Sequence, residues 1–273
     1  MDKINKLKLD KLREVIRTSG SLVVAFSGGV DSSLIAKVAF DELGDRSIAV
    51  TIASDTLSGR ELDIAKKVAG EIGIAHEVVT HSELDNEDFV KNPVDRCYHC
   101  KKEEMDIMKD VASSRGFESI AFGVNISDFG EYRPGIKALR EESFFEPLVE
   151  AGIGKDEIPD IAASLGLSNY DLPSTTCLAS RIPYGETITK KKLERIEQGE
   201  NFLHDLGIKQ VRVRNYNDIA RIEVDENQIE IVVRNRKEIM KIFRELGFIY
   251  VSLDLEGYRS GSMNEVLEED KKG

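Results

Sequence analysis

Residues 21–33, SLVVAFSGGVDSS, contain a short apolar run, a glycine turn and the start of a helix. The run 21–26 is rich in β-branched and aliphatic residues, which is typical of a strand buried on both faces. Gly28 and Gly29 allow the backbone to turn tightly and approach an anion, and the helix that follows presents unpaired N–H groups. This order predicts a phosphate-binding loop. The alternative is an ordinary turn in which Asp31 caps the helix.

The loop differs from two common nucleotide fingerprints. It has no lysine, so it is not the Gly-x4-Gly-Lys-Ser/Thr loop, and it lacks the spacing of the Gly-x-Gly-x-x-Gly motif. Ser27, Ser32 and Ser33 supply hydroxyl donors in addition to the backbone.

The alternation of apolar strands and helices continues through the first two thirds of the chain. Further strands are expected at 47–54, 75–80 and 119–125, and helices at 1–20, 33–44, 59–73, 100–116 and 156–167. Strands that alternate with helices of about 10 to 15 residues predict an α/β fold with a doubly wound, mostly parallel sheet.

The pattern changes after residue 183. A helix is expected at 190–207, strands at 210–216 and 219–224, a mostly helical stretch at 227–247 and a closing strand at 249–255. This order predicts a smaller C-terminal α+β domain with an antiparallel sheet. The predicted domains are 1–183 and 184–273.

Composition narrows the class of protein. The net charge of −12 and the absence of Trp argue against nucleic acid as a partner, because phosphate backbones and unstacked bases require basic and aromatic surface. Three cysteines in 273 residues fit a reducing compartment. There is no secretory signal and no apolar run of about 20 residues, so we expect a soluble cytoplasmic protein without a membrane partner.

The stretch SGGVDS resembles the SGGxDS loop of the PP-loop ATP pyrophosphatases. These enzymes cleave ATP between the α and β phosphates, adenylate a carboxylate or carbonyl oxygen and release pyrophosphate. The resemblance implies ATP and Mg²⁺ as cofactors, with Asp31 near the metal. It also implies that the pyrophosphate is held by Ser27, Gly28, Gly29, Asp31 and Ser32.

A closer resemblance covers essentially the whole chain. The LarE family of ATP-dependent sulfur transferases is similar in NPVDRCYHCKK (92–102), GVNISDFGEYRPG (123–135), EPLVEAGIGKDEI (146–158), CLASRIPYGETIT (177–189) and VSLDLEGYRSGSMNE (251–265). LarE converts the two carboxylates of pyridinium-3,5-dicarboxylate mononucleotide to thiocarboxylates for the nickel-pincer cofactor of lactate racemase. The family usually has arginine where this chain has Pro159.

Residues near Cys177 suit such chemistry. A carboxylate is a poor electrophile, but its acyl-adenylate has a good leaving group that a sulfur nucleophile can displace. Ser180 and Arg181 follow Cys177 closely and are candidates for holding a carboxylate or phosphate. The alternative is that Cys177 is a small buried apolar residue.

Other candidates lie at predicted strand ends and on a predicted strand face. Carboxyl ends of parallel strands line the ligand crevice, so Ser54, Gly123, Asp128 and Arg133 are expected to bind ATP; an ordinary loop salt bridge is the alternative for the last two. Two further pairs come from the C-terminal part. Arg212 and Arg214 share one strand face, which suits a phosphate; the resemblance implies that this is the substrate phosphate, and the alternative is a solvated ionic face. The resemblance also places Glu200 and Glu223 at an interface metal of a homo-hexamer, and the alternative for them is plain surface charge.

The three cysteines leave several possibilities open. In the LarE family some members sacrifice the sulfur of the cysteine that matches Cys177, and others use three cysteines to bind a [4Fe–4S] cluster that carries an extra sulfide. This chain has Cys97, Cys100 and Cys177, which favours the cluster and a supply of sulfide or another sulfur donor. The alternatives are sacrifice of Cys177 without a cluster, a dithiol, or zinc bound with the help of His99.

Three other functions are compatible with a PP-loop. An amide-forming ligase requires an ammonia source, and no glutaminase nucleophile or separate glutaminase domain is recognisable in the sequence. A tRNA-thiolating enzyme requires affinity for tRNA, which the acidic charge disfavours. A non-enzymatic nucleotide-binding regulator would bind ATP without releasing AMP and pyrophosphate.

Overall fold

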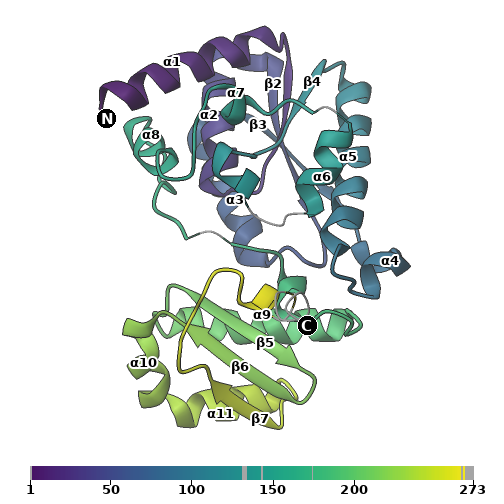
Figure 1. The fold of residues 1–273 in the computed structure, drawn as a ribbon, viewed down its shortest axis with the longest axis vertical. Coiled ribbons are helices and arrows are strands. Elements are labelled where there is room, and N and C mark those ends of the chain that lie inside the picture. Colours follow the sequence, from purple (N-terminus) through teal and green to yellow (C-terminus); the bar gives the residue numbers. More distant parts are fainter. Residues whose placement is uncertain (1, 131–133, 143, 174, 266, 268–273) are drawn as a thin grey trace. The chain divides into compact units, whose positions relative to one another are not determined.

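A computed structural model describes residues 2–130, 134–142, 144–173, 175–265 and 267. The chain divides into two compact units, Met1–Glu83 with Asp95–Thr175, and Leu84–Val94 with Thr176–Gly273 (Figure 1). The domain boundary between residues 183 and 184 stays a prediction.

The first unit contains the parallel sheet that the sequence predicts. Its four strands are β1 (Leu22–Ala25), β2 (Ser47–Ala53), β3 (Ala75–Thr80) and β4 (Ser119–Ala121), in the order β3-β2-β1-β4. The chain runs outward from β1 through β2 to β3 and then crosses to the other side of β1 as β4, with all pairs parallel. The doubly wound fold is thereby confirmed, and its switch point lies between β1 and β4.

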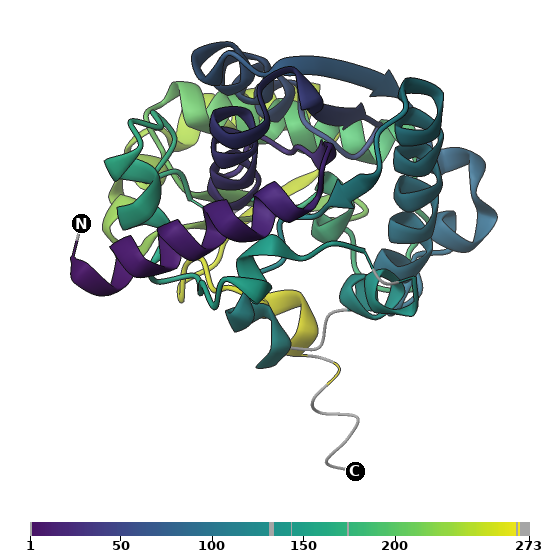
Figure 2. The same ribbon diagram turned by 90° about the horizontal axis from the view of Figure 1, so that it is seen from above.

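Helices cover both faces of this sheet because alternate residues of β1 point to opposite sides. Leu22 and Val24 pack in one core, and Val23 and Ala25 in the other. The first core is closed by α1 (Lys3–Thr18), α2 (Val30–Leu43), α3 (Gly59–Ile72), α7 (Pro147–Glu150) and α8 (Ile158–Ser164), the second by α5 (Arg96–Arg115) and α6 (Pro134–Glu141) (Figures 1 and 2).

Local signals explain where these helices begin and end. Ser58 and Glu61 form a capping box at the start of α3, and Gly73 ends it in the left-handed conformation. Pro159 falls in the first turn of α8, where its missing N–H is tolerated. Helix α5 begins at Arg96, four residues before the predicted start at residue 100.

The second unit has a mixed sheet, which corrects the expected antiparallel one. Strands β5 (Val211–Tyr216) and β6 (Ile219–Val224) form a hairpin, but β7 (Tyr250–Leu253) runs parallel to β6. The chain returns to the start of β6 through two helices, and such a crossover makes the next strand parallel. The helices of this unit are α4 (Glu87–Val90), α9 (Lys190–Asp205), α10 (Ile229–Arg234) and α11 (Arg236–Glu245).

Hydrogen bonds tie the short segment 84–94 to the rest of the second unit, and several of them are made by one buried asparagine. Asn92 is fully buried and donates from its amide to the carbonyls of Ile182, Pro183 and Glu186. Its φ of +54° is one that asparagine tolerates better than most residues. These bonds hold the segment beside the chain that leads into α9.

Within the described ranges, no helix combines the length and the apolar character that a membrane crossing requires.

Candidate active site

The predicted phosphate loop lies at the switch point of the parallel sheet. It leaves the carboxyl end of β1 and enters α2, whose N-cap, Gly29, makes no side-chain capping hydrogen bond. The first-turn N–H groups of a helix have no intrahelical acceptors, and they carry the positive end of the helix dipole. The loop therefore offers a set of fixed donors to an anion.

Two serine hydroxyls organise the loop from inside. Ser32 Oγ donates to the Gly29 carbonyl at 3.0 Å and lies 3.3 Å from the Ser27 N–H. The Gly29 N–H donates to Ser27 Oγ at 3.2 Å. These last two bonds are long, so a phosphate oxygen can replace them at little loss.

The strict glycine requirement falls on Gly28. Its φ is +76°, and a Cβ there would lie 2.7 Å from the Cα of Ala65 in α3. Gly29 has an ordinary φ of −71°, and a Cβ there would meet only Ser27 Oγ, at 3.3 Å. Gly28 is thus needed for the backbone conformation and for close packing, while a side chain at Gly29 would mainly obstruct an anion.

Asp31 is held by a residue that the sequence analysis did not single out. Asn125 is buried in the loop after β4 and donates from Nδ2 to Asp31 Oδ2 at 3.0 Å. The backbone N–H of Asn125 donates to Asp128 Oδ2 at 3.0 Å. Gly123 packs against the first turn of α2, where a Cβ would come within 3.3 Å of the Ser32 nitrogen. The loop from Ser27 to Ser32 and the segment after β4 therefore contact each other. Arg133, which was also expected to bind ATP, lies outside the described residues.

A chain of polar contacts links the end of β2 to Cys100. The hydroxyl of Ser54 lies 3.2 Å from that of Thr56, which donates to Glu83 Oε1 at 2.9 Å. The thiol of Cys100 donates to the same oxygen at 3.9 Å. Glu83 is 5% exposed, and among the described residues its Oε2 has no hydrogen-bond partner. The structure thus connects the predicted ATP residue Ser54 with a predicted cluster ligand.

Cys97 and Cys100 lie one turn apart in α5; Cys97 is exposed and Cys100 half-buried. Residues three apart share a helix face, which suits joint binding of one group. Burial alone lowers the pKa of Lys101, but the charges of Glu104, Cys100 and Cys97 outweigh it, so the pKa is raised. Lys101 therefore carries a positive charge near the two sulfurs.

Cys177 belongs to the other unit, so the structure does not place it relative to the Cys97 pair. In the described part of the chain, no group of three or more His, Cys, Asp or Glu side chains is arranged to hold a metal. His99 lies 3.7 Å from Asp95, and neither gathers further ligands there.

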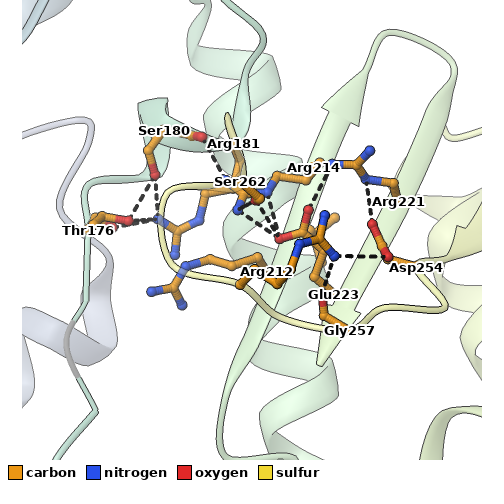
Figure 3. A network of polar contacts seen from close by, with 12 residues as sticks. Thr176, Ser180, Arg181, Arg212, Arg214, Arg221, Glu223, Asp254, Gly257 and Ser262 are labelled. Atoms are coloured by element: carbon orange, nitrogen blue, oxygen red, sulfur yellow. Dashed lines mark hydrogen bonds and ion pairs between the residues drawn. The ribbon is translucent and has the colours of Figure 1, made fainter. Parts of the chain in front are cut away.

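Arg181 fixes the backbone around Cys177. Its guanidinium is 3% exposed and forms a two-pronged ion pair with Glu200 of α9, at 2.9 and 3.0 Å. The remaining nitrogen, Nη1, donates to the carbonyls of Thr176 and Cys177 and to Ser180 Oγ (Figure 3). Arg181 therefore positions the Cys177 loop, while direct contact with substrate stays a prediction.

Arg212 and Arg214 are buried rather than solvated, but they differ in their partners. Arg214 pairs with Glu223 at 2.7 Å and donates to the Ser180 carbonyl and Ser262 Oγ (Figure 3). Arg212 donates to the Val211 carbonyl and lies over the Tyr258 ring at 5.2 Å.

Buried ion pairs surround Arg212 and Arg214 in this network. Burial and then the nearby Arg181 charge lower the pKa of Arg212, in spite of Glu200. Among the described residues, Arg181 pairs with Glu200, Arg214 and Arg221 both pair with Glu223, and Arg221 also pairs with Asp254. Glu200 and Glu223 are committed to these ion pairs, and their role at an interface metal stays a prediction.

We expect Glu200→Gln to destabilise the protein by about 3 kcal/mol at neutral pH, because it leaves Arg181 buried without its counter-charge. Burial alone raises the pKa of Glu200, but Arg181, Arg212 and the Val213 N–H lower it below its ordinary 4.5. A depressed folded pKa contributes stability above pH 4.5 that is lost as the pH falls.

Urea unfolding at several pH values tests this prediction. The difference in unfolding free energy between wild type and Glu200→Gln should be constant above pH 4.5 and shrink below it. Glu194→Gln, at an exposed position on the same helix, is the control and should behave as wild type. A difference that does not change with pH would contradict the assignment.

Comparison with known proteins defines the class of enzyme. The asparagine synthase family model matches residues 9–145, which include the parallel sheet and the glycine loop. The match and the loop at the switch point define an ATP-using enzyme of the PP-loop class.

Relatives of similar length define the family. An uncharacterized protein of Synechocystis sp. is 44% identical over 95% of this chain and 98% of its own. The pyridinium-3,5-bisthiocarboxylic acid mononucleotide synthase of Lactiplantibacillus plantarum is 37% identical over 90% of each chain. This chain belongs to the same family, the LarE family of ATP-dependent sulfur transferases. A tRNA-specific 2-thiouridylase of Rickettsia massiliae is 27% identical over 69% of this chain.

Proposed function

We propose that this enzyme adenylates the carboxylates of pyridinium-3,5-dicarboxylate mononucleotide and converts them to thiocarboxylates, in biosynthesis of the nickel-pincer cofactor of lactate racemase. The observation that carries the proposal is the 37% identity, over nine tenths of both chains, to a synthase named for the bisthiocarboxylic acid product.

The first half of the reaction belongs to the unit with the parallel sheet. A substrate carboxylate oxygen attacks the α-phosphorus of ATP, the bond to the β-phosphate oxygen breaks, and pyrophosphate leaves. The loop from Ser27 to Ser32 stabilises the departing charge with fixed N–H and hydroxyl donors. Ser54, Gly123, Asp128 and Arg133 are proposed to contact the rest of ATP.

The oxygen donors at this site fit Mg²⁺. Asp31 accepts from the side-chain amide of Asn125 and Asp128 from its backbone N–H, and hard cations prefer carboxylate oxygens. Mg²⁺, when bound, neutralises phosphate charge. The protein's own contribution is to hold Asp31 in one orientation.

The second half requires a sulfur atom, for which Cys177 is the proposed residue. In the sacrificial route its thiolate attacks the acyl-adenylate carbonyl and AMP leaves, which produces a thioester. Loss of the Cys177 α-proton and cleavage of its Cβ–S bond then release the thiocarboxylate and leave dehydroalanine. Arg181 acts in either route by fixing the backbone of residues 176 and 177.

The alternative that we favour is a [4Fe–4S] cluster held by Cys97, Cys100 and Cys177. These three thiolates would hold the cluster, which would supply the sulfur as an additional sulfide. The one-turn spacing of the first two cysteines in α5 supports joint ligation of one group. We further propose a homo-oligomer, a hexamer by family resemblance, in a reducing cytoplasm.

A direct assay tests the proposal. Protein, ATP–Mg²⁺, the dicarboxylate mononucleotide and a sulfide source are incubated without oxygen, and AMP and thiocarboxylate are measured by mass spectrometry. Thiocarboxylate that requires both ATP and the mononucleotide supports the proposal. AMP formation that instead requires tRNA would identify a tRNA-thiolating enzyme, and ammonia dependence would identify an amide-forming ligase.

We expect Arg212→Ala to weaken binding of the mononucleotide by about 1.5–3 kcal/mol and to leave ATP affinity unchanged. Arg214→Ala should act differently, because it leaves Glu223 buried without its main partner and destabilises the protein by about 3–5 kcal/mol. Calorimetric titration with each ligand and urea unfolding separate the two effects. Equal losses of ATP and mononucleotide affinity in Arg212→Ala would contradict the phosphate assignment.

A further inference from the structure

A buried asparagine far along the sequence reaches the phosphate loop. Asn169 follows α8 and is 2% exposed. Its position is fixed on either side, because Leu167 is buried in the first core and Ser168 bonds to Glu71 of α3. The Leu172 N–H closes a turn on the Asn169 carbonyl at 3.2 Å.

Both N–H groups of the Asn169 amide are used at the loop. Nδ2 donates to the Gly28 carbonyl at 2.8 Å and to Ser33 Oγ at 2.8 Å. One side chain thus ties the glycine turn to the first turn of α2. The two bonds also fix the orientation of the amide, since its oxygen cannot face the Gly28 carbonyl.

The bond that holds the Gly28 carbonyl also sets the direction of an N–H group that can donate a hydrogen bond to phosphate. In a planar trans peptide the carbonyl and the following N–H point in opposite directions. The Gly28 carbonyl and the Gly29 N–H belong to one such peptide, so the bond from Asn169 turns the Gly29 N–H to the other side. There it meets Ser27 Oγ, among the donors of the loop.

A second observation separates this amide from an ordinary packing residue. Within the described residues, Asn169 Oδ1 is buried without a hydrogen-bond partner. Buried unsatisfied acceptors are uncommon and are found where another requirement dominates. Here the requirement is the pair of donors, which a carboxylate of the same shape does not have.

We infer that Asn169 is a positioning residue for ATP cleavage, which holds the loop in its pyrophosphate-binding conformation. The inference rests on the proposed ATP site. Asn169 does not touch the reacting atoms and acts through the Gly28–Gly29 peptide. Without it the peptide can rotate, and the loop loses a donor aimed at the departing pyrophosphate.

Affinity of the full chain for inorganic pyrophosphate and for ATP tests the inference. Asn169→Ala should weaken both by about tenfold and by the same factor, since one aimed donor is lost. Asn169→Asp should weaken both further, because it removes the donors and places negative charge beside the anion. Asn169→Ser, which keeps one short donor, should be intermediate and serves if the alanine variant does not fold.

Ser168→Ala is the matched control, because it loosens the same segment without touching the loop, and it should bind both ligands as wild type does. Wild-type affinity in Asn169→Ala, or an equal loss in Ser168→Ala, would overturn the role of Asn169. A wild-type protein that binds neither pyrophosphate nor ATP would instead overturn the proposed ATP site.

Discussion

Asp31→Ala is expected to lower AMP formation by about 100- to 1,000-fold, the range for loss of a fixed electrostatic group at a centre where charge develops. Asp31 lies in the first turn of α2, and Asn125 holds its carboxylate at 3.0 Å. Its loss removes the carboxylate that we assign to Mg²⁺ beside the phosphates. The fold should persist, because the change removes no core side chain.

Single-turnover AMP formation with ATP–Mg²⁺ and the mononucleotide measures this effect. Asp31→Asn keeps the shape but not the charge, so it should be nearly as inactive as alanine if charge is what matters. Asp41→Ala, exposed on the same helix, should behave as wild type. Turnover close to wild type in Asp31→Ala would refute the assignment of the loop.

Cys177→Ser is expected to abolish thiocarboxylate formation while AMP is still released. The serine keeps the size of the side chain but supplies no sulfur, and the ATP loop belongs to the other unit. Product analysis by mass spectrometry measures both outcomes in one reaction. Thiocarboxylate at the wild-type level would exclude Cys177 from the path of the sulfur.

Cys97→Ala and Cys100→Ala distinguish the two sulfur routes. If the cluster is present, anaerobically prepared wild type contains about four irons per chain, and either variant loses iron and repeated turnover with supplied sulfide. If Cys177 is sacrificed, both variants keep their activity and Cys177 becomes dehydroalanine after one turnover. Stoichiometric zinc without iron would refute the cluster.

Much of the first unit could be predicted from short stretches. The order of strand, glycine turn and helix at residues 21–33 depends on neighbours in sequence, and the structure has β1, the loop and α2 in that order. The helix starts were less accurate, since α2 begins at Val30 and α5 at Arg96. Capping there depends on backbone geometry that apolar periodicity does not record.

The second unit contains buried ion pairs, which the periodicity of apolar residues cannot predict. Glu200 and Glu223 fit an ordinary polar surface by sequence, yet they are 7% and 1% exposed. They are buried because arginines from other elements neutralise them. The sequence shows which residues are charged but not which of them form ion pairs in the fold.

The sequence by itself determined the fold class, the order of strand, glycine turn and helix, and the family, because each depends on residues close together in the chain. Only the tertiary structure decided that Asn125 holds Asp31, that Asn169 holds Gly28 and that Arg181 holds the Cys177 backbone. The first two pairs are 94 and 141 residues apart. Such partners meet through the crossover of the sheet and the return of the chain after α8, and no local pattern of apolar and polar residues encodes that meeting.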